Sequence, residues 1–232
     1  MPKHALLIGG NSGMGAATAT HLQETGWSLS AAARTPGPLE NLGIPVQPFD
    51  AAAVPELTLP ETLHGLVYFP GTINLKPFHR LDVDDFRADF EVNCLGAARV
   101  IQQALPALKN AGQASVVLFS TVAVGTGMPF HASIAAAKGA VEGLARSLAA
   151  ELAPGIRVNI IAPSLTDTTL AESLLNTEAK REAAEHRHPL QRIGDPAEVA
   201  RTVGYLLSPD SGFMTGEVLR LDGGLGSLKL FR

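Results

Sequence analysis

The chain has 232 residues, a net charge of −4 at neutral pH and a single cysteine, Cys94. One cysteine excludes an intrachain disulfide, so we expect a cytoplasmic protein in a reducing compartment. Lys and Arg form no run that would hold a nucleic acid, and no apolar stretch approaches the ~20 residues that cross a bilayer. We therefore expect no contact with nucleic acid or membrane, and the short apolar run at residues 5–8 is not expected to be a secretory signal.

Short apolar runs alternate with helical patterns along the chain. The runs are typical of strands buried on both faces, and the alternation predicts an α/β fold in which helices cover both sides of a parallel sheet. The expected strands are Ala5–Ile8, Leu29–Ala33, Ile44–Phe49, Leu66–Phe69, Ser115–Ser120, Arg157–Ile161 and Val218–Leu221. The expected helices are Gly13–Thr25, Asp84–Ala111, Ser133–Ala153, Thr169–His186 and Pro196–Leu207.

The first helix follows a glycine-rich turn, Gly9-Gly10-Asn11-Ser12-Gly13-Met14-Gly15. Gly9 allows a tight turn, Gly13 lets the backbone approach a pyrophosphate, and Gly15 lets the helix pack closely. The free N–H groups of the helix N-terminus favour an anion. After a first strand, this turn predicts a single doubly wound Rossmann-type domain over residues 1–232, with about seven strands. A glycine turn without a ligand is the alternative.

The second long helix carries a polar residue, Asn93, on or near an apolar stripe that includes Phe86, Phe90 and Ala97. A polar residue in that place is either paired in the core or functional. Pro106 is expected to kink this helix or to end its regular part.

The segment from Phe119 to Gly125, followed by residues 131–138, resembles the catalytic segment of the short-chain dehydrogenase/reductase family. That family has a Ser after a strand, then a Tyr, then a Lys one helical turn later. Aligned on Lys138, Thr121 stands at the Ser position and Ile134 at the Tyr position. The glycine turn, Asn93, the segment 157–168 and the C-terminal segments 189–198 and 221–224 match in the same order, so the resemblance covers nearly the whole chain.

The resemblance implies a bound dinucleotide. Where NAD binders have an acidic residue, Arg34 and Thr35 follow the second strand, and an Arg can pair with a 2′-phosphate. We therefore expect NADP(H) in preference to NAD(H); the alternative is that Arg34 is a solvated charge. The expected cofactor-binding residues are Gly9, Asn11, Ser12, Gly13, Met14, Gly15, Arg34, Thr35, Asp50, Gly71, Lys138, Pro163, Leu165 and Thr168.

The resemblance also assigns catalytic positions. Lys138 would hold the nicotinamide ribose, Asn93 would hold a water and Lys138, and Thr121 would orient a carbonyl. Ile134 cannot donate a proton, and loss of a general acid costs ~10²–10⁴-fold in rate. His131, three residues before Ile134, is the best titratable substitute, although a loop His at a helix start is the alternative.

Tyr68 is interpreted as core packing, and His186 and His188 as lid or surface residues. We expect no metal site, because no convergent ligands are evident.

These patterns lead to competing functional hypotheses. The first is an NADP(H)-dependent oxidoreductase with a modified active site and a small-molecule substrate. An activated C=C or a quinone-like acceptor would suit such a site, because its reduction needs less help from a positioned acid. The second is a catalytically inactive NADP(H)-binding sensor or regulatory protein. Ile134 favours the second, whereas Asn93, Thr121, Lys138 and an expected substrate lid at about residues 165–190 favour the first. The family resemblance also implies a homodimer or homotetramer, formed through the long helices and the C-terminal segment.

Overall fold

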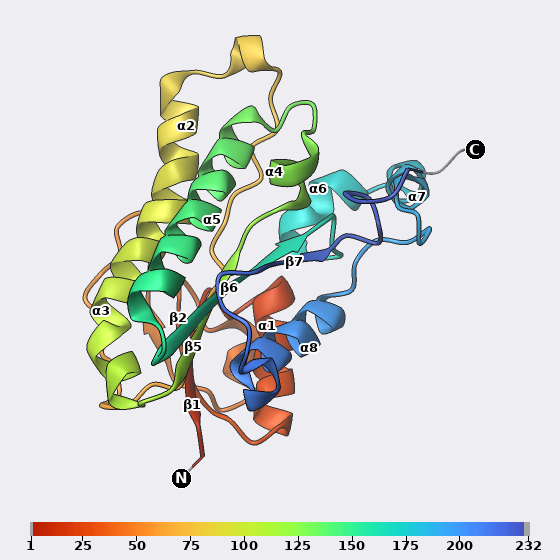
Figure 1. Cartoon of the computed structure of the whole chain (residues 1–232). Helices are drawn as coiled ribbons and strands as arrows, with labels where there is room; N and C mark the ends of the chain where they lie inside the picture. The colour runs from red at the N-terminus through yellow and green to blue at the C-terminus, as the bar shows by residue number, and fades with distance from the viewer. Residues whose placement is uncertain (1, 230–232) are drawn as a thin grey trace.

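The computed structural model describes residues 2–229, which form a parallel sheet of seven strands (Figure 1). The strand order is β3-β2-β1-β4-β5-β6-β7. Chain connections switch direction between β1 and β4, and open α/β sheets bind ligands at the carboxyl ends of the strands flanking such a point. The strands are His4–Ile8 (β1), Ser28–Ala33 (β2), Val46–Pro48 (β3), Gly65–Tyr68 (β4), Ala114–Phe119 (β5), Ile156–Pro163 (β6) and Val218–Leu221 (β7).

Every expected strand is present, so the predicted α/β fold with a doubly wound Rossmann-type sheet is confirmed. Strand β3 is shorter than the expected Ile44–Phe49. It lies at the sheet edge and contains Pro48, with Pro45 just before it. Prolines cannot donate to the ladder, so they restrict pairing at an edge strand.

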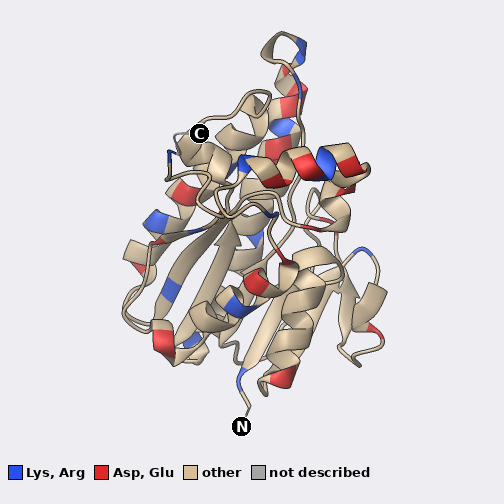
Figure 2. Ribbon diagram, turned by 90° about the vertical axis from the view of Figure 1, so that its right-hand side faces the viewer, with Lys and Arg blue, Asp and Glu red and all other residues tan. Residues whose placement is uncertain are grey.

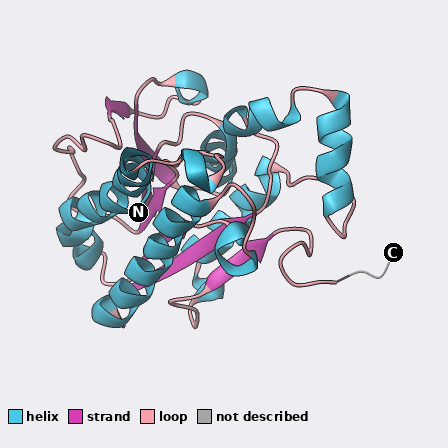
Figure 3. Ribbon diagram, turned by 90° about the horizontal axis from the view of Figure 1, so that it is seen from above, coloured by secondary structure: helices cyan, strands magenta, loops and turns pink. Residues whose placement is uncertain are grey.

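Helices pack on both faces of the sheet (Figure 3). On one face α1 (Gly13–Glu24) and α8 (Pro196–Leu207) pack beside each other. On the other face lie α3 (Gly96–Asn110) and α5 (Ala132–Leu152), with α2 (Val83–Phe90) against the upper part of α5. An apolar cluster lies on each side of the strands, and a third, smaller one joins Ala171, Leu175, Ala184 and Ile193 in the region of α6 and α7.

The expected helix Asp84–Ala111 is interrupted by a π-helical segment, η3, over Glu91–Leu95. The side chain of Asn93 donates to the Asp89 carbonyl at 2.7 Å and so takes an acceptor that an α-helix gives to a backbone N–H. Pro106 lies inside α3, which continues to Asn110, so of the two expected effects the helix does not end there, and a kink stays a prediction. Buried Ala104, Ala107 and Leu108 hold that turn against the core.

The prediction of one helix over Thr169–His186 is also wrong. This segment forms a 3₁₀ turn, η4 (Thr169–Ala171), then α6 (Glu172–Leu175) and α7 (Glu178–Arg187). The break arises at Thr177, because its hydroxyl accepts the Lys180 N–H at 3.3 Å and caps a new helix. These helices project beyond the sheet and form a lid over its carboxyl edge (Figures 1 and 3).

The remaining elements are a short helix, α4 (Val122–Thr126), and the 3₁₀ turns η1 (Gly37–Leu39), η2 (Phe78–Arg80) and η5 (Pro209–Ser211). Figure 2 shows acidic and basic residues interspersed over the face in view. Across residues 2–229, none of the helices has the length and hydropathy needed to traverse a bilayer. Within the same residues, no group of three or more His, Cys, Asp or Glu side chains is arranged to hold a metal ion.

Candidate active site

The glycine turn lies at the carboxyl end of β1, between that strand and α1. Gly13 has a φ of +48°, and a Cβ placed on it would lie 3.1 Å from the side chain of Thr168. A Cβ on Gly15 would lie 2.7 Å from the Gly10 Cα and the Gly9 carbonyl oxygen. The turn therefore tolerates only glycine at these points, and it exposes backbone N–H groups at a helix N-terminus as an anion site requires. Thr168 lies beside it, and its expected contact with the cofactor stays a prediction.

The residues after β2 lie next to this turn. Asn11 Nδ2 donates to Thr35 Oγ1 at 3.1 Å, which joins the glycine turn to the loop that carries Arg34. Arg34 is exposed, and Asp50 is exposed at the end of the β3 loop, where its carboxylate accepts the Ala52 N–H at 2.9 Å. The loop that carries the exposed Arg34 therefore lies next to the glycine turn, and its role toward a 2′-phosphate stays a prediction.

Lys138, Asn93 and Gly71 meet below the cavity, although they come from three different elements. A Cβ on Gly71 would lie 3.2 Å from both Asn93 Oδ1 and Lys138 Nζ. Lys138 Nζ donates to the Phe119 carbonyl at 2.9 Å. Burial lowers the pKa of Lys138 to about 8, against an opposing effect of the Asp89 carboxylate. The π-helical segment is what turns Asn93 towards this lysine.

Asn93 is held by residues that sequence reasoning missed. Its amide donates to Thr72 Oγ1 at 2.9 Å, and Thr72 donates to the buried carboxylate of Asp89 at 2.6 Å. Asn93 Oδ1 is buried and has no hydrogen-bond partner within residues 2–229. Thr72 directly follows Gly71 and could have been noticed for that reason, but no periodicity in the sequence points to Asp89.

Thr121 and Ile134 face the same cavity as Lys138. Thr121 caps α4, and its Oγ1 accepts the Ala123 N–H at 3.3 Å. Ile134 is 5% exposed and lies one helical turn before Lys138 on α5. His131 is the residue before α5 and is half-buried, and its Nδ1 lies 2.7 Å from the Pro129 carbonyl oxygen. His131 also lines the cavity, so its proposed acid role stays a prediction.

The cavity has a volume of about 720 Å³ and lies over the carboxyl ends of β4, β5 and β6. Pro163, Leu165 and Thr168 line it from β6 and the lid, so the structure brings these predicted residues to the catalytic positions. Most of its remaining wall is apolar, with Ile73, Leu75, Met128, Leu170 and Leu174 among the lining residues.

Tyr68 is part of the core, as interpreted from the sequence. Its hydroxyl donates to the Val92 carbonyl at 2.6 Å, and burial raises the pKa of Tyr68 well above its usual range. A Cβ on Gly96 would lie only 2.2 Å from this hydroxyl, so Gly96 makes room for it.

Of the two interpretations of His188, a lid or a surface residue, the surface one is wrong: His188 directly follows α7 in the expected lid segment and is buried at 3% exposure. Its Nε2 lies 2.7 Å from Ser164 Oγ, and both residues line the cavity. Ser164 stands where the family has Gly after Pro163, and that departure was the available signal for this pair.

A dinucleotide fits these residues on structural grounds. The turn around Gly13 and Gly15 leaves no room for side chains, Gly71 keeps space open beside Lys138, and Asn93 Oδ1 is an unpaired buried acceptor. These are the features of a preformed polar cradle at the switch point of the sheet.

Comparison with known proteins shows which family the chain resembles. Residues 51–226 match the family model described as enoyl-(acyl carrier protein) reductase. The 3-oxoacyl-(acyl-carrier-protein) reductase of Thermotoga maritima is 32% identical over 96% of this chain and 97% of its own length. A tropinone reductase homologue of Arabidopsis thaliana is 39% identical over 70% of this chain, but the match spans only 63% of that protein.

Among solved structures, a gluconate 5-dehydrogenase from Burkholderia cenocepacia in complex with NADP and tartrate superposes with a TM-score of 0.88. It is 27% identical, and the superposition covers 98% of this chain and 96% of that one. The glycine turn, the Lys138 cluster and these likenesses agree, and the chain belongs to the short-chain dehydrogenase/reductase family of oxidoreductases.

Proposed function

We propose that this protein is an NADP(H)-dependent reductase of apolar, electron-poor acceptors such as enones or quinones. The observation that carries the proposal is the combination at the cavity: Lys138, Asn93 and Gly71 keep a polar cradle, while Ile134 stands where the family acid would be. The apolar wall favours a hydrophobic acceptor over a sugar or another polyol.

The chain's own residues divide the work. When bound, the reduced nicotinamide supplies a hydride. The N-terminus of α1 holds the phosphates, Arg34 pairs with the 2′-phosphate, and Lys138 binds the nicotinamide ribose hydroxyls, with Asn93 holding Lys138 in place. Thr121 orients the acceptor oxygen by a hydrogen bond. Ile134 supplies no proton, so acceptors whose reduced form is protonated easily are favoured over simple ketones.

Turnover is tested by following NADPH oxidation with menadione, 2-cyclohexen-1-one and a set of simple ketones and aldehydes. We expect oxidation with the quinone or the enone and much slower oxidation with the simple carbonyls. A dinucleotide titration by calorimetry runs beside it. Fast reduction of simple ketones by the wild-type protein would contradict the proposed substrate class.

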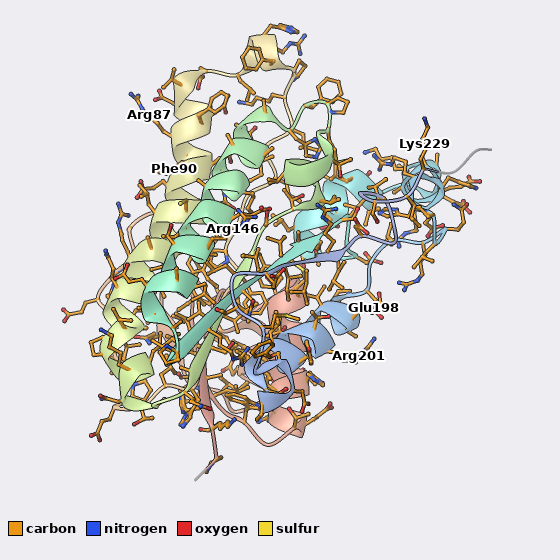
Figure 4. The ribbon with its side chains drawn as sticks, viewed as in Figure 1. Arg87, Phe90, Arg146, Glu198, Arg201 and Lys229 are labelled. Atoms are coloured by element: carbon orange, nitrogen blue, oxygen red, sulfur yellow. The ribbon has the colours of Figure 1, made fainter. Side chains whose placement is uncertain are left out.

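A preference for NADP(H) predicts a selective effect of Arg34→Ala. We expect the variant to bind NADPH about 10–100-fold more weakly, the loss of a charge-assisted hydrogen bond, and to bind NADH unchanged. Arg87→Ala is the control, because Arg87 is an exposed arginine on α2 that points away from the core (Figure 4). Equal weakening of both cofactors, or tighter NADH binding by the wild type, would overturn the preference.

A second candidate function is an NADP(H)-binding sensor or regulatory protein without turnover. It is favoured by Ile134, whose buried aliphatic side chain occupies the acid position. Tight binding of NADPH without oxidation by any acceptor in the panel would support the sensor and contradict the reductase. Failure to bind either dinucleotide would contradict both.

The proposal includes a homodimer or homotetramer in the cytosol. The outer faces of α2 and α5 lie side by side and present Phe90 and Arg146, respectively (Figure 4). Phe90 is 39% exposed, so a second copy on this face would bury it. The cytosolic location rests on the single, buried cysteine. Sedimentation of the purified protein tests the assembly.

A further inference from the structure

The buried pair Ser164–His188 lies in the cavity but has no part in the chemistry described so far. Ser164 directly follows β6 and is fixed there, because its N–H donates to the Leu221 carbonyl at 3.0 Å. His188 follows α7 and is fixed by its own N–H on the Glu185 carbonyl at 3.0 Å. The pair therefore joins the sheet to the lid at one wall of the cavity.

The hydrogen bonds of His188 define its tautomer. Nδ1 lies 2.7 Å from the Ala184 carbonyl oxygen, which can only accept, so Nδ1 carries a hydrogen. Nε2 lies 2.7 Å from Ser164 Oγ, which is its hydrogen-bond partner within residues 2–229. In the neutral imidazole Nε2 accepts from Ser164, and in the imidazolium it donates to Ser164, which frees the serine hydrogen for the cavity.

We propose that Ser164, backed by His188, protonates the acceptor oxygen as a weaker acid than the missing tyrosine, which is why acceptors that are protonated easily suit this site. This inference rests on the proposed reductase function. Ser164 lines the same cavity as Thr121, Ile134 and Lys138, and a buried histidine behind it renews its proton. His131, the substitute considered from the sequence, is instead half-buried at a loop and has its Nδ1 engaged by Pro129. Ser164 is the catalytic residue and His188 its positioning and relay residue.

The proton balance of the reduction is complete. Hydride addition to the acceptor carbon shifts an electron pair onto the acceptor oxygen, and that oxygen takes the proton of Ser164 Oγ. Ser164 Oγ takes the proton of His188 Nε2 in the same step. His188 is left as a neutral imidazole that still donates from Nδ1 to Ala184, and solvent in the cavity returns the proton to Nε2 through the Ser164 hydroxyl before the next cycle.

Kinetics with menadione and 2-cyclohexen-1-one test the relay. We expect Ser164→Ala to lower kcat about 10²-fold with little change in KM or in the Kd of NADPH, because a proton donor acts in the transition state. Ser164→Thr keeps a hydroxyl and should restore kcat. His188→Gln can still hydrogen-bond Ser164 but cannot carry a proton, so it should lower kcat like Ser164→Ala.

His186→Gln is the matched control. Its Nδ1 also lies near a carbonyl one turn back, that of Glu182 at 2.9 Å, but its side chain is exposed and outside the cavity. A pair that only latches the lid predicts normal kcat in His188→Gln and a raised KM in Ser164→Ala, and either result would overturn the relay. If the wild-type protein shows no turnover, the proposed reductase function itself is contradicted. If the wild type turns over and the Ser164 and His188 variants do so equally fast, only the relay is contradicted.

A readout without turnover is the ¹⁵N NMR spectrum of the histidine side chains in the free protein. We expect neutral His188 to carry its hydrogen on Nδ1, with an Nε2 shift that changes in Ser164→Ala and stays unchanged in His186→Gln. An Nε2–H tautomer of neutral His188 would show that the ring does not accept from Ser164, and the relay would be excluded.

Discussion

Ile134→Tyr is expected to give this protein the ability to reduce simple ketones. A tyrosine at position 134 would stand one helical turn before Lys138, and a phenol there is flanked by the Lys138 charge and by Thr121 at the cavity wall. A phenol is a much stronger acid than the hydroxyl of Ser164, so ketone reduction should rise over the wild type by up to the ~10²–10⁴-fold that a positioned general acid contributes. NADPH oxidation with the same panel of ketones measures it.

The control for this gain is Ile134→Phe, which has the same ring without the hydroxyl. Ile134→Phe should leave ketone reduction at the wild-type level. A gain in Ile134→Tyr that is absent in Ile134→Phe is then due to the phenol hydroxyl acting as proton donor. In the Ile134→Tyr protein, Ser164→Ala should have little effect on ketones, because the phenol supplies the proton. No gain in Ile134→Tyr, with NADPH still bound, would mean that Lys138, Asn93 and Thr121 are not arranged for hydride transfer.

Lys138→Met is expected to stabilise the free protein at neutral pH while weakening cofactor binding. The folded pKa of about 8 lies below the unfolded value of 10.5, so below pH 8 the folded state holds a buried charge. That buried charge lowers the free energy of unfolding by on the order of 3 kcal/mol, and replacing it with methionine removes this cost. The methionine also loses the hydrogen bond to the Phe119 carbonyl, which offsets part of the gain. We expect a net gain of about 1–3 kcal/mol at pH 7, or a Tm higher by about 2–4 °C per kcal/mol.

The pH dependence of this gain has a definite sign. Between pH 8 and 10.5 the unfolded wild-type chain binds a proton that the folded one does not, so wild-type stability rises with pH through this window. The advantage of Lys138→Met should therefore be largest below pH 8 and shrink towards pH 10.5. Thermal unfolding from pH 7 to 10 measures it, with Lys109→Met, an exposed lysine of α3, as control.

The same variant tests the role of Lys138 towards the dinucleotide. Losing an ammonium that binds ribose hydroxyls should weaken NADPH about 10–100-fold. A variant that is more stable and binds NADPH normally would show that Lys138 does not face the cofactor. A variant less stable at pH 7 than the wild type would show that the buried charge is compensated in the folded state.

The repeating part of the fold was predictable because it depends on local patterns. Buried parallel strands are continuous apolar runs, and Gly9, Gly13 and Gly15 have steric requirements that can be read from their spacing. Lys138 and Asn93 were found through the family resemblance, and the structure brings them within reach of one glycine, Gly71.

The parts that were missed depend on contacts between distant segments. Ser164 and His188 are 24 residues apart and meet only because the lid turns back at Thr177, where a hydroxyl caps a new helix. A periodic pattern over Thr169–His186 contains no information on that break. Asp89 was missed for a related reason, since its burial depends on Thr72, which belongs to another segment.

The π turn at Glu91–Leu95 also sets how far α3 is rotated about the helix axis relative to α2. Each residue advances an α-helix by about 100°, so a wider turn offsets the angular drift that four-residue steps accumulate. Asp85, Asp89 and Asn93 therefore stay near one azimuth, while Val100 and Leu108 beyond the turn reach the sheet. A one-residue deletion in this turn would rotate α3 relative to α2. Either the polar side chains of α2 and the π turn would then lose their partners, or the apolar side chains of α3 would turn away from the sheet. The length of the turn is therefore constrained by both helices.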